Sequence, residues 1–207
     1  MNDLQDALIT RKKETELVID QIEKSKFSDK TFNKNNSIQK ALVFLMCYNA
    51  IESTVFLSLQ WLFDEIKINC TRFSELNSNI QRIYNRYYLS PKYSSCSTTF
   101  EERHRLSFED YSKIVITFFG NLDARKIRGI LSDYGISNDF HVKGESELLK
   151  IKSYRNQLTH GEVTFNGVGR NYTILDICKI QNIAFDFLEQ YEKSLTEYIT
   201  NKKYFTA

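Results

Sequence analysis

The chain has very few residues that interrupt a helix: one proline and seven glycines among 207 residues. Proline removes a backbone donor and clashes with the preceding turn, so a chain this poor in breakers favours long helices over a many-turned β architecture. Hydrophobic residues make up 42% of the chain, which is enough for a sizeable core without disulfides or a metal. We therefore expect an all-α fold, a bundle of long helices.

The spacing of apolar residues predicts where the helices lie. A polar loop ending in Ser37, a plausible N-cap, precedes the second helix. Asp123 begins a later helix that Gly135 ends, and Gly161 ends the next one. Residues 163–174, with Gly167 and Gly169, indicate a short loop or hairpin. The helices are expected over about residues 2–26, 38–68, 71–89, 123–135, 145–160 and 173–202, with Leu148, Leu149, Ile151 and Leu158 as the apolar positions of the fifth.

The most apolar run, residues 41–63, is long enough to span a bilayer. It carries polar residues at Asn49, Glu52, Ser53, Ser58 and Gln60. These positions favour a buried central helix over a membrane span.

The chain is expected to be a single domain over residues 1–207, because no internal repeat or Pro/Gly linker divides it. A smaller inserted segment is expected near residues 90–145. Within it, residues 90–109 are rich in Ser and Thr and then charged, which is typical of an insertion or a flexible loop. The apolar run 111–119 fits either a strand or a turn of helix.

Charge and cysteine content narrow the functional classes. Lys and Arg number 28 against 26 Asp and Glu, so any nucleic-acid binding must come from a local patch. The four cysteines show no C-x-x-C spacing, and Cys47 and Cys178 sit among apolar residues as expected for core positions. Reduced thiols and a charged N-terminus without a secretory segment indicate a cytoplasmic chain.

The stretch SYRNQLTHGEVTF, residues 153–165, carries the most chemically suggestive residues. Asn156 and His160 are four residues apart on one helix face, and the long side chain of Arg155 can swing along the helix end toward them. Histidine can move a proton near neutral pH, and a guanidinium suits a phosphate. The set therefore fits metal-free RNA cleavage, in which a base activates a 2′-OH and a cation stabilises the transition state.

One histidine cannot conveniently serve both sides of the phosphorus, so a two-fold homodimer would supply a second histidine and arginine to the same cleft. The plainer interpretation is that Arg155 and His160 cap the last carbonyls of a helix and contact solvent. No metal site or cofactor is predicted, because His104 and His141 lie in other segments without ligand spacing.

The motif R-N-x-L-T-H-G, from Arg155 to Gly161, resembles the R-x4–6-H signature of the HEPN superfamily, the higher eukaryotes and prokaryotes nucleotide-binding domain. The segments YNAIES around Glu52, GNLDARKIRGILSDYGI and GRNYTILDI are similar to a prokaryotic subfamily of stand-alone toxin or defence proteins. The resemblance covers most of the chain. It implies a helical bundle that dimerises with both motifs facing a shared cleft.

The resemblance also implies an activity and its residues. The expected enzyme is a metal-independent endoribonuclease of toxin–antitoxin, anti-phage or abortive-infection systems, leaving 2′,3′-cyclic phosphate and 5′-hydroxyl ends. Arg155 would be the transition-state cation, His160 the acid and base, and Asn156 would orient the site, with Glu52 and Thr159 in support. The alternative for Glu52 is a glutamate hydrogen-bonded inside the bundle. RNA is the expected substrate, and a cognate antitoxin or defence-system protein the expected partner.

One departure concerns the HEPN branch that is silenced by modification of a tyrosine shortly after the histidine. In this chain no tyrosine follows His160 until Tyr172, which puts that mode of silencing in doubt.

Several residues are candidates for RNA contact. Tyr154 and Tyr172 could stack on bases. The basic candidates are Arg103, Arg105, Lys126, Arg128, Lys143, Lys152 and Arg170. A non-catalytic module that binds a nucleotide or a protein is the alternative, and an inert structural domain of a larger complex is a third interpretation.

Overall fold

The computed structural model describes residues 2–24, 30–70, 72–88 and 120–206. Residues 90–109 and the ambiguous run 111–119, both within the insertion predicted near residues 90–145, lie outside these residues, as do Arg103, His104 and Arg105.

The described residues form seven α-helices, a single 3-10 turn and no β-strand, which confirms the all-α prediction. One isolated bridge joins Leu76 to Phe205. The helices are α1 (Asn2–Lys24), α2 (Lys30–Asn69), α3 (Ser78–Tyr88), α6 (Ala124–Tyr134), α7 (Glu147–Thr159), α8 (Phe165–Gly169) and α9 (Ile174–Thr200).

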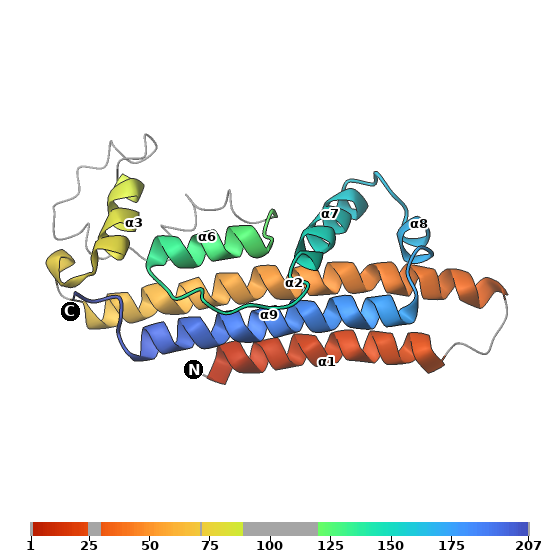
Figure 1. The fold of residues 1–207 in the computed structure, drawn as a ribbon, viewed down its shortest axis with the longest axis horizontal. Helices are drawn as coiled ribbons and strands as arrows, with labels where there is room; N and C mark the ends of the chain where they lie inside the picture. The colour runs from red at the N-terminus through yellow and green to blue at the C-terminus, as the bar shows by residue number, and fades with distance from the viewer. Residues whose placement is uncertain (1, 25–29, 71, 89–119, 207) are drawn as a thin grey trace.

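The helices form two layers (Figure 1). The long helices α1, α2 and α9 lie side by side and pack on one another as a base. The shorter helices α3, α6, α7 and α8 lie over one side of that base, with α7 and α8 packed on α2. Helix α7, which carries the R-x4-H motif, therefore lies in the upper layer and packs on the central helix.

Helix α2, 40 residues long, is the central core element. Phe44, Cys47, Ile51 and Leu62 are fully buried, and apolar side chains cover most of its circumference. By length and composition α2 could cross a membrane, but 56% of its apolar window is buried inside the protein, as in the core helix of a soluble protein. The prediction of a buried central helix is confirmed.

The start of α2 was predicted wrongly. The helix begins at Lys30, and Ser37 is a buried residue inside it, not an N-cap. Helix α8 packs on this end of α2 so closely that a Cβ on Gly169 would lie 1.7 Å from the Ser37 carbonyl oxygen. This tertiary contact outweighs the weak helix propensity of the polar run before Ser37.

The predicted third helix also begins later than expected. Phe73–Glu75 is a 3-10 turn, and α3 starts at Ser78, where the Asn77 side chain accepts a hydrogen bond from the Ile80 N–H. Asparagine is among the best N-cap residues, which explains why the helix begins there.

The prediction of a loop or hairpin at residues 163–174 is wrong, because this segment contains a helix. This is the short helix α8, whose N-cap Thr164 accepts a hydrogen bond from the Gly167 N–H. Leu149 is likewise not a core residue, because its side chain is 55% exposed on α7.

Other boundaries follow the prediction. Asp123 caps α6, and Gly135 ends it in the left-handed region, at a φ of 71°. Thr173 and Asp176 form a capping box at the start of α9. Cys47 is buried as predicted, whereas Cys178 is only half-buried.

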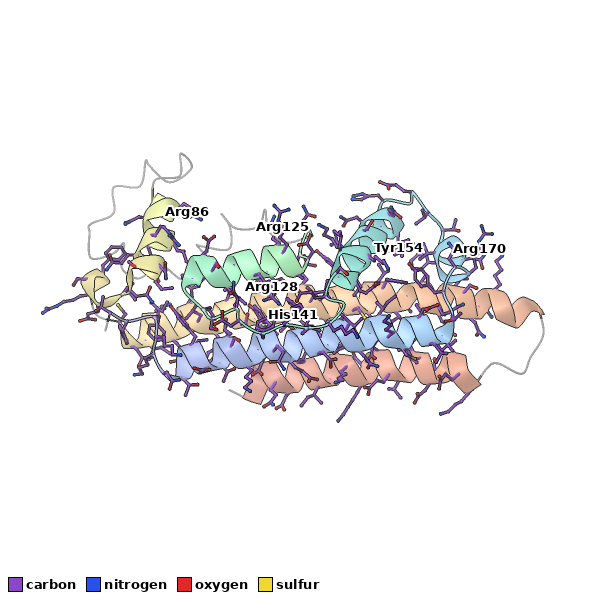
Figure 2. The ribbon with its side chains drawn as sticks, viewed as in Figure 1. Arg86, Arg125, Arg128, His141, Tyr154 and Arg170 are labelled. Atoms are coloured by element: carbon purple, nitrogen blue, oxygen red, sulfur yellow. The ribbon has the colours of Figure 1, made fainter. Side chains whose placement is uncertain are left out.

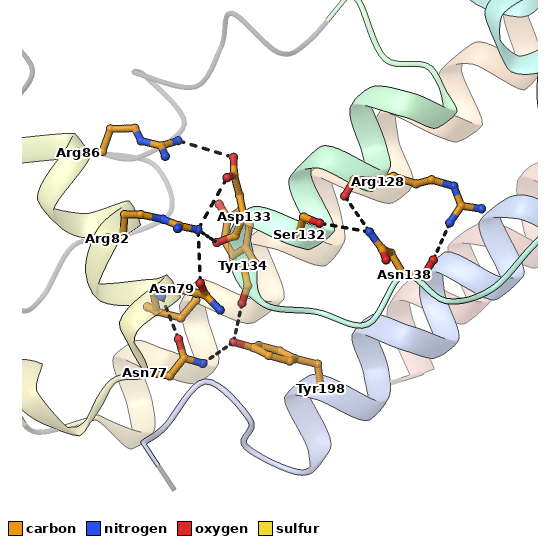
Figure 3. Close-up of polar contacts among 11 residues, drawn as sticks. Asn77, Asn79, Arg82, Arg86, Arg128, Ser132, Asp133, Tyr134, Asn138 and Tyr198 are labelled. Atoms are coloured by element: carbon orange, nitrogen blue, oxygen red, sulfur yellow. Dashed lines mark hydrogen bonds and ion pairs between the residues drawn. The ribbon is translucent and has the colours of Figure 1, made fainter.

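Polar contacts join α3, α6 and α9 at one end of the molecule (Figure 3). Asn77 Nδ2 donates to the Tyr198 hydroxyl, which donates to the Tyr134 carbonyl. Arg82 donates to the Asp133 carbonyl. These bonds fix α6 over the base.

Candidate functional site

The motif lies on α7, which ends within it. His160 is the C-cap, and Gly161 follows with a φ of 71°. The Glu162 N–H donates to the Gln157 carbonyl and the Gly161 N–H to the Leu158 carbonyl. This is the Schellman pattern, which uses a left-handed glycine to satisfy the last carbonyls of a helix.

The Arg155 side chain points at α2 and is held on several sides. Its Nη2 lies 3.8 Å from Glu52 Oε2, and its guanidinium carbon lies 4.6 Å from the centre of the Tyr48 ring. Its Nη1 donates to the Gly120 carbonyl at 3.3 Å and to Asn156 Oδ1 at 3.0 Å. The arginine is therefore fixed by an ion pair, a ring face and two acceptors.

Glu52 and Tyr48 also hold the backbone that Arg155 contacts. The Gly120 N–H donates to Glu52 Oε1, and the Leu122 N–H donates to the Tyr48 hydroxyl at 3.2 Å. Burial raises the pKa of Tyr48, so its hydroxyl stays protonated at neutral pH.

Asn156 and Thr159 act within this helix. The Asn156 side-chain oxygen accepts a hydrogen bond from Arg155, so this amide orients the arginine. The Thr159 hydroxyl donates to the carbonyls of Arg155 and Asn156. Its contacts are those of a helix-terminal threonine bonding its own backbone.

His160 is exposed, and no described residue is hydrogen-bonded to its imidazole. Five residues along an α-helix turn the direction of a side chain by about 140°. Arg155 accordingly does not swing along the helix end toward His160; it faces Tyr48 and Glu52 on α2. Within this chain the fixed cation and the exposed imidazole therefore point in different directions.

Lys152, one turn before Arg155, pairs with Asp123 at 2.5 Å. Burial alone would raise the pKa of Asp123, but the Lys152 ammonium and the Lys126 N–H outweigh it and hold that pKa below its ordinary value. Because Asp123 caps α6, the pair ties the start of α6 to α7.

Tyr154 packs against the core. Its ring lies 5.0 Å from Phe44 and 5.9 Å from Tyr172, and the Tyr172 hydroxyl donates to that of Tyr154. Burial, followed by this contact with Tyr154, raises the pKa of Tyr172. Lys40 donates to the Tyr172 carbonyl and joins the cluster to α2.

The basic residues that are candidates for RNA contact differ in whether their side chains are bonded within the protein or exposed. Arg128 is bonded to Glu145 and to two carbonyls, whereas Lys143 and Arg170 are exposed. Figure 2 shows Arg125 on α6 and Arg170 next to α8, on either side of α7. Arg125 is an exposed cation that the sequence did not single out.

Sequence reasoning also missed Tyr48 and Gly120 as neighbours of Arg155. Tyr48 precedes Glu52 by four residues on α2, so the helical spacing was a usable signal once Glu52 had been noticed. Nothing in the sequence placed Gly120 against Arg155. Among the described residues, no group of three His, Cys, Asp or Glu side chains is arranged to hold a metal ion.

The chain was also compared with known families. The model of the family described as HEPN_MAE_28990-like HEPN matches residues 1–204. No curated protein and no solved structure matches the chain. The helical fold and the near full-length match lead to one conclusion: the chain belongs to the HEPN_MAE_28990-like HEPN family.

Proposed function

We propose that the protein is a metal-independent endoribonuclease that acts as a homodimer in toxin–antitoxin or anti-phage defence. Membership of a HEPN family is consistent with either a ribonuclease or a nucleotide-binding module. The contacts around Arg155 and the free state of His160 favour the ribonuclease.

One observation carries the proposal. Arg155 is held by four groups in a fixed position, while His160, at the end of the same helix, has an exposed imidazole without a hydrogen-bond partner among the described residues. A fixed cation suits a developing negative charge, because it needs no reorganisation during the reaction. A free imidazole suits proton transfer.

The reaction is an internal transfer at phosphorus. A histidine removes the proton from a ribose 2′-OH, and the oxygen attacks the adjacent phosphate. The bond from phosphorus to O2′ forms as the bond to the 5′-oxygen breaks, and a second histidine protonates the leaving oxygen. Arg155 stabilises the extra negative charge on the phosphate oxygens.

A second copy supplies the groups that one copy lacks. Arg155 and His160 diverge around α7 by about 140°, so one protomer does not present both to the same phosphate. A two-fold axis beside α7 would bring His160 of each copy into a cleft shared with the other. Exposed apolar side chains on α2, Ile38 and Leu42, offer surface for such an association.

The test is cleavage of total RNA in excess EDTA by the wild type, His160→Ala and Arg155→Ala, with mapping of product ends. We expect cyclic-phosphate ends from the wild type and a loss of at least about a hundredfold in both variants. His141→Ala is the matched control, because His141 is exposed in the loop between α6 and α7. Retained cleavage by His160→Ala would reject the mechanism.

The alternative, a non-catalytic binding module, is favoured by one feature. A groove of about 410 Å³ between α1 and α2 is lined by Arg11, Glu14, Asn49, Ser53 and Glu52. Its mixed lining, which also includes Met46, and its contact with Glu52 suit a small ligand such as a nucleotide. A dimer by light scattering that binds nucleotides but leaves RNA intact would support this function.

A further inference from the structure

The backbone from Gly120 to Leu122 lies against the Arg155 side chain, although it is 35 residues away in the sequence. Gly120 has a φ of 87°, and a Cβ at this position would lie 3.5 Å from Arg155 Nη1. Its carbonyl accepts from Arg155, while its N–H donates to Glu52. One peptide segment thus connects the arginine to its counter-ion.

Tyr48 on α2 is a second link between Arg155 and this backbone segment. Its ring supports the guanidinium at 4.6 Å, and its hydroxyl accepts the Leu122 N–H at 3.2 Å. Tyr48 and Glu52 are four residues apart, so they project from the same face of α2. Each contacts both the arginine and the 120–122 backbone.

We propose that Tyr48 and Glu52 are positioning residues. They hold the Gly120–Leu122 backbone against α2, and that backbone in turn helps to fix the Arg155 side chain. We call these two hydrogen bonds, from Gly120 to Glu52 and from Leu122 to Tyr48, the latch. The inference rests on the proposed function for its effect on cleavage. The latch itself is a property of the fold and is testable without activity.

The contacts show why both side chains are needed. Without the latch, the Gly120 carbonyl would be free to leave Arg155, and the guanidinium would lose an acceptor. Without Glu52, a half-buried arginine would lose its counter-ion, and Gly120 would lose its acceptor. An arginine that samples several rotamers can still contact a loosely bound phosphate. It is not held where charge develops in the transition state, so the transition state loses more stabilisation than the bound substrate does.

The first test is amide hydrogen exchange by NMR. Tyr48→Phe removes only the hydroxyl that accepts from Leu122, and Glu52→Ala removes the acceptor for Gly120. We expect exchange at these amides to rise by about tenfold in the respective variants. Tyr191→Phe is the matched control, because its hydroxyl bonds Ser58 elsewhere in the core. Unchanged exchange at both amides would overturn the latch.

The second test separates positioning from a purely structural role. On a short RNA with one mapped cleavage position, Tyr48→Phe and Glu52→Ala should lower kcat by about tenfold or more with KM changed less than twofold. Glu52→Gln should restore part of the loss, since its amide oxygen can still accept from Gly120. Glu65→Gln is the control on α2, where Glu65 bonds Trp61 and Asn69 of its own helix.

The outcomes are distinguishable. A higher kcat in Glu52→Gln would mean that Glu52 competes with phosphate for Arg155, and would overturn the positioning role. A lower melting temperature with unchanged kcat would also overturn it. If the wild type does not cleave RNA, the proposed function fails, and the exchange measurement still decides whether the latch exists.

Discussion

Arg155 and Glu52 face each other across two helices, with Nη2 of the arginine 3.8 Å from Oε2 of the glutamate, and both side chains are about three-quarters shielded from solvent. Such a pair costs desolvation and is stable only when further hydrogen bonds complete it. Gly120 and Asn156 supply those bonds. The arginine is consequently held in place by the fold itself.

The end of α7 should depend on the backbone of Gly161. With a φ of 71°, alanine at this position would be strained, although nothing lies within 4 Å of its Cβ. Gly161→Ala should lower the free energy of unfolding by about 1–2 kcal/mol in chemical denaturation.

Gly129→Ala is a control for which the opposite change in stability is expected. Gly129 lies inside α6, also with nothing within 4 Å. Here alanine should raise stability by about 0.5–1 kcal/mol through helix propensity. A gain from Gly161→Ala would contradict the left-handed cap.

The pair between Asp123 and Lys152 predicts a pH dependence. Burial opposes ionisation of Asp123, but Lys152 and the Lys126 N–H lower its pKa in the folded state. A lowered folded pKa gives stability that is present above the unfolded pKa, about 4, and is lost as pH falls through the folded value. Asp123→Asn should therefore reduce the melting temperature at pH 7, and the difference from the wild type should shrink below about pH 4.

Asp64→Asn is the matched control, because Asp64 is exposed on α2. Its melting temperature should follow the wild type across the same pH series. An equal loss for Asp123→Asn at pH 7 and pH 3 would show that the cap, and not the ion pair, accounts for the effect.

Arg128 should be costly to remove. It bonds Glu145 at 2.6 Å and the carbonyls of Asn138 and Phe140, and lies 4.6 Å from the Phe140 ring centre. Figure 3 shows it beside Asn138, whose amide returns a bond to the Arg128 carbonyl. Arg128→Ala should lower the free energy of unfolding by about 2–3 kcal/mol in urea titration, since two carbonyls lose donors.

Arg82→Ala is a suitable comparison because Arg82 is exposed, donates to one carbonyl, that of Asp133, and lies 3.9 Å from the Asp133 carboxylate. Exposed pairs contribute little, so the loss should stay below about 1 kcal/mol. Equal losses for the two arginines would contradict the role of Arg128 in the loop after α6.

The contact between α8 and α2 should tolerate no side chain at Gly169. A Cβ would lie 1.7 Å from the Ser37 carbonyl oxygen, which is backbone and cannot rotate away. Gly169→Ala should lower the free energy of unfolding by about 3 kcal/mol or more. Gly167→Ala should cost less, because its Cβ would meet only the Thr164 hydroxyl at 2.9 Å.

Local signals in the sequence located several elements well. Asp123, Gly135 and Thr173 act on their own neighbours, so the ends of α6 and the start of α9 could be read from the chain. The prediction that Ser37 caps a helix was wrong. Ser37 packs against Gly169, which lies 132 residues later, and no local rule connects the two residues.

In the candidate site, too, some features could be predicted from the sequence and others depend on residues that are distant in the sequence. Arg155, His160 and Glu52 could be named from residue type and spacing, and from the family resemblance. The direction of the Arg155 side chain could not, because it is set by Tyr48 on another helix and by Gly120. The pairing of Lys152 with Asp123 joins residues 29 positions apart and also needed the tertiary fold.

The surroundings of Arg155 are gathered from three distant stretches: α2 at Tyr48 and Glu52, the backbone at Gly120–Leu122, and α7. A growing polypeptide cannot bring these together until α7 has left the ribosome and packed on α2. Under the proposed function, a nascent chain in which α7 has not yet been made lacks the assembled surroundings of Arg155. An RNA-cutting protein built this way cannot act on its own message until α7 has packed on α2.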